Sequence, residues 1–342
     1  MPHPTVTLAD QISHEFRTPL TVIKEYSSLI RDGLMGNVNP RQAQMLGVVD
    51  DRVDDLHNLV DNMLHLVRLR AGEPYLNRRA WAAGELLERV RIAAERKLTA
   101  QGKQLEWKCA AELPDVFCDD DHLQRALNNL VQYAAARRDR SAPIEISVSE
   151  SGDNLLICIP HGDREQLDAT PTEEEFEQSV PLKVARQLID WNYGEFDDRN
   201  RCEFVITLPT FHPERIVKRH VEWLSARHGA TQAAVYRCEC RAADAKTIDA
   251  VRQQVGAALR YYTERYELVV PTEDHWRVVA PVNEDGSTDW LARFAKMTAE
   301  LGVLATDVEL SLELIGQWEL REGVECLLER ACNSDFELAV SR

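Results

Sequence analysis

The chain lacks any long apolar run, and none of its segments approaches the ~18 to 20 apolar residues that a membrane-spanning helix needs. It shows no secretory leader at its start and no low-complexity tract. Its eight cysteines are scattered, and Cys238-x-Cys240 is not answered by a second pair at zinc-site spacing. These absences predict that the sequence has no membrane-spanning helix and that its cysteines are reduced. The chain is expected to be cytoplasmic, either as a whole or as the soluble part of a longer protein.

Positive charge is also in short supply. Against 57 Asp and Glu residues there are only 40 Lys and Arg residues, and the formal net charge is -17. Such a chain repels the phosphate backbone of nucleic acids and anionic membrane surfaces, so neither is expected as the main partner. What remains is the composition of a folded protein, 44% hydrophobic and 28% charged, with a length that allows two or three domains.

Two long amphipathic helices are predicted at the N-terminus. Apolar residues recur at helical spacing from Thr5 to about Asp32, and a break rich in Gly and Asn follows. The apolar residues of the second run step by three and four: Met45, Val49, Val53, Leu56, Val60, Met63 and Val67. The Asp pairs 50–51 and 54–55 are expected mostly on the outer face. Two such helices cannot bury both stripes alone, so we predict a homodimer that forms a four-helix bundle.

His14 lies off the apolar stripe of the first helix and is therefore expected to face solvent. Glu15 is its neighbour and Thr18 follows one turn later, while Pro19 costs roughly 3 kcal/mol in a helix interior and so predicts a bend or an end there. An exposed imidazole beside a carboxylate suits a nucleophile toward phosphorus. For a lone surface histidine, a solvated side chain is the more frequent explanation.

The whole octet Ser13-His14-Glu15-Phe16-Arg17-Thr18-Pro19-Leu20 resembles the phospho-acceptor box of two-component sensor histidine kinases, at every position of the S-H-E-[FL]-R-T-P-L pattern. The resemblance implies that His14 is phosphorylated and that Glu15 is its acid–base partner. It also implies that Thr18 positions water when a response regulator is dephosphorylated. Residues 1–73 are thus predicted to form a dimerisation and histidine phosphotransfer hairpin.

Residues 74–210 resemble the α/β-sandwich ATP-binding domain that follows this hairpin in the family. The predicted order begins with a strand that leads into a helix, followed by the strands of 103–120 as a pair and a second helix. A hairpin turning at Gly152-Asp153, a third helix and a final strand complete it. Six residues match the family's N box, a helical motif of the nucleotide site: Asp119, Leu123, Leu127, Asn129, Leu130 and Ala134. Asn129 is accordingly a candidate remnant of a cofactor-binding residue.

The departures from the family pattern all fall where ATP would bind. Tyr133 replaces the second N-box asparagine, and a phenol is a poor ligand for Mg²⁺. Pro160-His161-Gly162-Asp163 stands in place of D-x-G-x-G, and Ser179-Val180-Pro181-Leu182-Lys183-Val184 in place of the glycine-rich phosphate loop. Proline removes an amide donor where phosphate needs one. We therefore expect neither an ATP or Mg²⁺ cofactor nor any other metal, unless the chain is an active kinase.

A connector helix is predicted over 211–230, followed by a ferredoxin-like domain over 231–342 with the order β-α-β-β-α-β and a closing helix near 323–332. The predicted hairpin tip, Thr272-Glu273-Asp274-His275-Trp276, weakly resembles the G-G-D-E-F signature of diguanylate cyclases, without its two glycines. Glu273, Asp274 and His275 can be interpreted as a metal-binding cluster, although a solvated turn is the favoured interpretation.

The chain is thus predicted to be an α+β multidomain protein of two-component signal transduction. The favoured function is a pseudokinase that acts as a histidine phosphotransferase or response-regulator phosphatase through His14. An active ATP-dependent sensor histidine kinase and a non-catalytic adaptor that docks a regulator or kinase are the alternatives. The expected partners are a second copy of the chain, a response-regulator receiver domain and a cognate histidine kinase.

Overall fold

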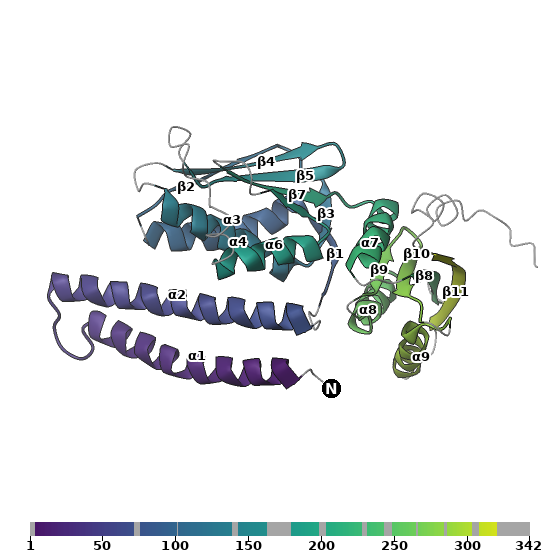
Figure 1. Ribbon diagram of the computed structural model, residues 1–342, viewed down its shortest axis with the longest axis horizontal. Helices are drawn as coiled ribbons and strands as arrows, with labels where there is room; N and C mark the ends of the chain where they lie inside the picture. Colours follow the sequence, from purple (N-terminus) through teal and green to yellow (C-terminus); the bar gives the residue numbers. More distant parts are fainter. Residues whose placement is uncertain are drawn as a thin grey trace, which may run out of the picture.

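The computed structural model describes residues 4–71, 76–100, 102–138, 143–162, 179–197, 203–227, 231–242, 248–264, 266–283, 286–302 and 308–319. Helices and sheets both contribute to the fold, as the α+β prediction requires (Figure 1). Within the ranges described, each helix is too short or too polar to cross a membrane.

The N-terminal hairpin consists of α1 (Pro4–Arg31) and α2 (Pro40–Ala71), which run antiparallel side by side (Figure 1). α1 continues without interruption through Pro19. Gly33 has a φ of 76°, a left-handed conformation that favours glycine in the turn. α2 then begins with a reciprocal capping box, because the backbone N–H of Gln42 donates to Asn39 Oδ1 at 2.9 Å and Asn39 N–H donates to Gln42 Oε1 at 2.9 Å.

Ion pairs join the two helices at intervals of seven residues along α1. Arg17 contacts Asp61 at 2.6 Å, Lys24 contacts Asp54 at 2.5 Å, and Arg31 contacts Asp50. The outer-face prediction is therefore wrong for Asp50, which is 7% exposed and faces Arg31. A buried carboxylate needs such a charged partner.

Large apolar side chains of the hairpin remain exposed in the single chain. On α1 they include Ile12 and Phe16, at 45% and 54%, and on α2 they include Leu56 and Met63, at 46% and 55%. Scattered apolar residues are ordinary on a surface, but a stripe along two helices has the pattern of a partner interface. The four-helix bundle remains a prediction, and this exposed stripe is the surface that a second copy would cover.

An α/β unit follows, in which α3, α4 and α6 cover one face of a five-stranded sheet (Figure 1). The strand order is β2-β4-β5-β7-β6, with β2 parallel to β4 and the other pairs antiparallel. The elements are α3 (Ala83–Ala100), β2 (Leu105–Cys109), α4 (Asp120–Arg137), β4 (Ile144–Ser151), β5 (Asn154–Pro160), α6 (Val180–Trp191), β6 (Glu195–Asp197) and β7 (Glu203–Pro209).

The two strands predicted as a pair over 103–120 do not pair with each other. β2 joins β4, whereas β3 (Asp115–Cys118) pairs with β1 (Arg79–Ala82) in a separate two-stranded sheet. Sequence proximity favoured a hairpin here, but β4 provides a longer, alternately buried partner for β2. The predicted hairpin at Gly152 is confirmed, since β4 and β5 are antiparallel neighbours around it.

The C-terminal part begins with α7 (Pro213–Arg227), inside the predicted connector. A four-stranded antiparallel sheet in the order β11-β8-β10-β9 follows, packed against α8 and α9. The elements are β8 (Gln232–Ala242), α8 (Ile248–Tyr261), β9 (Leu268–Pro271), β10 (His275–Pro281), α9 (Asp289–Gly302) and β11 (Val308–Glu319). This order along the chain is the predicted one; the ferredoxin-like assignment stays a prediction, and the closing helix near 323–332 lies outside the described residues.

Candidate functional site

The candidate phosphotransfer residues lie on the exposed surface of α1. The side chains of His14, Glu15 and Thr18 are all exposed, whereas Ser13 and Leu20 are buried. The helical period explains this division, because residues 13 and 20 are two turns apart on one face. Thus the structure brings together, within about one turn, an imidazole, a carboxylate and a hydroxyl that solvent can reach.

The Thr18 hydroxyl has a specific bond in this structure. Its Oγ1 donates to the backbone carbonyl of His14 at 3.1 Å, a common arrangement for threonine in a helix. While the hydroxyl donates to this carbonyl, its oxygen lone pairs can still accept a hydrogen bond from water. Next to it, Arg17 is fixed to α2 through its ion pair with Asp61.

Aromatic side chains occupy the region of the α/β unit where the sequence departs from a nucleotide site. The rings of Tyr133, His161 and Phe196 lie 5.7, 4.2 and 5.4 Å from the ring of Phe204, measured between centroids. His161 and Phe204 are fully buried. Rings at these distances pack in contact, so His161, which stands where the resemblance places the adenine-binding motif, packs against a buried ring of the core.

The segment that replaces the phosphate loop is the start of a helix. Ser179 is the residue before α6, and Pro181 lies in the first turn without an N–H group. The backbone N–H of Lys183 donates to the carbonyl of Ser179 at 3.1 Å. The first turn of α6 therefore lacks one amide donor, at Pro181, among the helix N-terminal N–H groups that a phosphate site uses. Asp163, the last residue of the other altered motif, lies outside the described residues.

Asn129, the candidate remnant of the N box, contacts the hairpin. Its Nδ2 donates to Asn62 Oδ1 on α2 at 3.2 Å and to the carbonyl of Pro181 at 3.3 Å. In return, Asn62 Nδ2 donates to Asn129 Oδ1 at 3.4 Å. The side-chain oxygen of Asn129 therefore accepts a hydrogen bond from α2.

A polar cleft of about 610 Å³ separates α2 from α4 around this contact. Its walls include Asp61 and Asn62 from α2 and Asp119, Arg125 and Asn129 from the α/β unit. Burial lowers the pKa of Arg125 in this cleft. Asp119 caps α4 by accepting from the N–H of His122 at 3.0 Å, so its carboxylate has a structural role.

The proposed metal cluster in the C-terminal part is not assembled. Among the described residues, no group of three or more His, Cys, Asp or Glu side chains could hold a metal ion. The prediction of a solvated tip is wrong for His275, which begins β10 and is only 9% exposed. Its Nδ1 lies 2.5 Å from Asp274 Oδ1, and this interaction lowers the pKa of Asp274.

Sequence reasoning missed Arg78, which follows the hairpin. This arginine is 5% exposed, and its guanidinium lies 4.4 Å from the ring centroid of Tyr193 and 5.6 Å from that of Trp223. Burial lowers its pKa to about 9. It contacts the α/β unit and α7 at once, through cation–π interactions. Nothing in the sequence marks this position, since its aromatic partners are more than 100 residues away.

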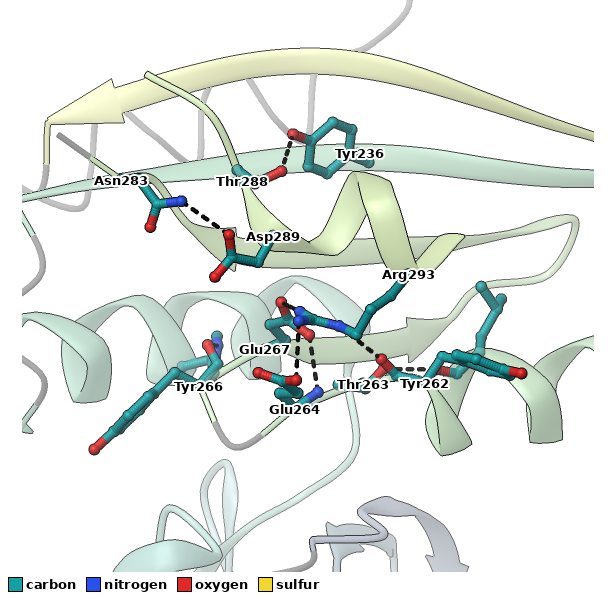
Figure 2. Close-up of polar contacts among 12 residues, drawn as sticks. Tyr236, Tyr262, Thr263, Glu264, Tyr266, Glu267, Asn283, Thr288, Asp289 and Arg293 are labelled. Atoms are coloured by element: carbon teal, nitrogen blue, oxygen red, sulfur yellow. Dashed lines mark hydrogen bonds and ion pairs between the residues drawn. The ribbon is translucent and has the colours of Figure 1, made fainter. Parts of the chain in front are cut away.

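A second missed cluster surrounds Arg293 on α9 (Figure 2). Its guanidinium contacts Glu264 at 3.0 Å and also Glu267, and its Nε donates to the carbonyl of Tyr262 at 3.2 Å. Figure 2 shows the two glutamates side by side against the guanidinium. This cluster fastens α9 to the loop between α8 and β9.

Comparison with known proteins gives a match for the hairpin. Residues 6–72 match the model of the His Kinase A (phospho-acceptor) domain. The alginate biosynthesis sensor protein KinB of Pseudomonas aeruginosa is 26% identical over 147 residues, which cover 43% of this chain and 25% of KinB. The histidine protein kinase SaeS of Staphylococcus aureus is 25% identical over 181 residues, which cover 52% of this chain and 51% of SaeS. The chain thus spans from a quarter to about half of the length of these relatives.

Solved structures of histidine kinases are also similar to this chain. ShkA, determined in complex with AMPPNP, aligns with a TM-score of 0.44 and 18% identity over 60% of this chain and 47% of ShkA. AdeS of Acinetobacter baumannii aligns with a TM-score of 0.39 and 19% identity over 58% of this chain and 98% of the AdeS chain.

Proposed function

We propose, from the premise that this chain is a relative of the two-component sensor histidine kinases and carries their phospho-acceptor hairpin, that it is a pseudokinase. It handles phosphoryl groups through His14 without using ATP. It acts as a histidine phosphotransferase or as a phosphatase of a response regulator. Its partners are a receiver domain, a cognate kinase and a second copy of the chain, which completes the four-helix bundle.

One observation supports this proposal: the phospho-acceptor residues are exposed, whereas His161, which stands in place of the family's adenine-binding motif, is buried against Phe204. His14, Glu15 and Thr18 are accessible on α1. His161 and Phe204 are fully buried at the position where the family resemblance predicts the base. A receiver domain can reach the exposed group, whereas ATP would have to displace a packed core.

The residues also do not fit Mg²⁺. Tyr133 accepts a hydrogen bond from Arg137 Nη1 at 3.0 Å, and a phenol oxygen beside a guanidinium is a poor ligand for a hard cation. Asn129 is bonded to Asn62 and Pro181. No step of the proposed chemistry therefore uses a nucleotide or its metal ion at this site.

Phosphotransfer needs only the acceptor helix and an aspartyl phosphate on the receiver domain. A ring nitrogen of His14 attacks phosphorus, the new N–P bond replaces the O–P bond, and the aspartate carboxylate leaves. Glu15 receives the hydrogen bond of the other ring nitrogen and stabilises the positive imidazolium as it forms. Reversal of the same step returns the phosphoryl group to the receiver.

Dephosphorylation differs only in the nucleophile. Water attacks the aspartyl phosphate, and inorganic phosphate and the free carboxylate are the products. Thr18 orients that water by accepting a hydrogen bond from it at the hydroxyl oxygen. In this reaction His14 is not phosphorylated.

The two reactions are separated by single substitutions in a receiver domain assay. With a receiver phosphorylated by a small-molecule donor, His14→Ala is expected to abolish transfer of the phosphoryl group to the chain while sparing dephosphorylation. Thr18→Ala is expected to slow release of inorganic phosphate about 10- to 100-fold, the scale of a lost positioning group. Transfer and phosphate release are both measured with radiolabelled receiver.

Matched controls are available on the same hairpin. Thr21 Oγ1 donates to the Arg17 carbonyl at 2.9 Å, so Thr21→Ala removes an equivalent bond one turn away. His57 on α2 provides a control histidine. If His14→Ala and Thr18→Ala both behave like these controls with every receiver tested, the chain is an adaptor and His14 has no chemical role.

A further inference from the structure

Two consecutive residues of α2, Asp61 and Asn62, bond to different neighbouring elements. Asp61 contacts Arg17, three residues after His14 on the acceptor helix. Asn62 contacts Asn129 on α4 of the α/β unit. α2 is therefore bonded to the acceptor box on one side and to the remnant of the nucleotide site on the other, and in Figure 1 it lies between α1 and the helices of the α/β unit.

The hydrogen bonds of Asn129 use both of its donors. A primary amide has two N–H donors and one carbonyl oxygen. One Nδ2 bond runs to Asn62 Oδ1 and one to the Pro181 carbonyl, while Oδ1 accepts from Asn62. The side chain of Asn129 is therefore hydrogen-bonded both to α2 and to the first turn of α6.

Apolar packing continues the same contact along α2. Leu66, one turn after Asn62, packs against the hydrophobic core of the α/β unit. Asn62 itself is only 2% exposed. A buried amide is costly when it is left without a partner, so separating α2 from α4 without rehydrating both amides is unfavourable. The amide pair therefore selects one docked position of the unit.

We propose that Asn62 and Asn129 form a latch that fixes the α/β unit to the acceptor hairpin. Asn129, which resembles an asparagine of the family's nucleotide site, connects the α/β unit to the hairpin in this latch. In the latched arrangement His14 is exposed, so a receiver domain can reach it. This last consequence rests on the proposed function; the latch itself depends only on the contact between α2 and α4.

Amide hydrogen exchange of the full chain tests the latch without any receiver domain. Asn62→Leu and Asn129→Leu are each expected to speed exchange in the facing parts of α2 and α4 about tenfold, since a net hydrogen bond is worth roughly one such factor. The double variant is expected to exchange no faster than Asn129→Leu alone, because the hydrogen bonds of Asn62 in this contact are all to Asn129 and are already lost in that variant.

The cleft between α2 and α4 also provides control positions for this experiment. Asn58 and Asn128 line it beside the latch residues, so Asn58→Leu and Asn128→Leu should leave exchange unchanged. The latch is refuted if Asn62→Leu leaves exchange in α4 unaltered, or if the two single effects add in the double variant. Either result leaves the receiver assay with His14→Ala and Thr18→Ala untouched, so the two proposals fail separately.

Discussion

At the scale of single residues, Glu267 combines burial with an ion pair. It is 7% exposed, and burial raises its pKa to about 7, although Arg293 opposes this rise. The unfolded chain releases this proton near pH 4.5. Between about pH 4.5 and about pH 7 the folded state therefore binds more protons than the unfolded state, and this group's contribution to stability falls as the pH rises.

We expect Glu267→Gln to remove this dependence. The free energy of unfolding of the wild type relative to the variant should decrease by on the order of 3 kcal/mol from about pH 4.5 to about pH 8. Urea unfolding at the two pH values measures it. Glu264→Gln is the matched control, since Glu264 contacts the same Arg293 but its side chain is 66% exposed. A wild type that gains stability over the variant with rising pH would show that the ion pair outweighs burial.

Residue-scale predictions succeeded where a periodic pattern defined the environment. The exposure of His14 follows from its place relative to the apolar stripe, and the structure confirms it. The burial of Asp50 and Arg78 was not predictable, because charged residues are normally exposed and their partners Arg31, Tyr193 and Trp223 come from other elements.

At the scale of elements, both helices of the hairpin were predictable, since seven apolar residues at steps of three and four specify α2. Strand pairing was less predictable. β2 and β3 are close in sequence yet join different sheets, because the partner of each strand is chosen by burial in three dimensions. The Asn62–Asn129 contact was likewise not predictable from the sequence, because it joins residues on two separate elements, α2 and α4.

The exposed stripe of the hairpin gives an element-scale prediction about assembly. Leu56→Asp with Val60→Asp would place charges in the core of the predicted four-helix bundle, at a cost of several kcal/mol each. We expect this double variant to be monomeric by light scattering. Ile92→Asp on α3 is the control, because Ile92 is 56% exposed outside the hairpin. A double variant that remains dimeric would place the interface on another surface.

At the scale of the whole molecule, the hydrophobic pattern of the α/β unit specifies its fold, in which α3, α4 and α6 cover the five-stranded sheet. Buried side chains such as Ile157, Leu188 and Phe204 define its core. The departures from the family's nucleotide motifs at Tyr133 and Pro181 were visible in the sequence. The packing of aromatic rings around Phe204 was not, because it depends on ring positions from several elements.

Titration calorimetry of the full chain with Mg·ATP distinguishes a pseudokinase from an ATP-dependent kinase. With Phe204 packed against His161, and Asn129 bonded to α2, we predict no binding up to low-millimolar nucleotide. A dissociation constant below ~100 μM, about -5.5 kcal/mol, would contradict the account and identify the chain as a nucleotide-binding kinase.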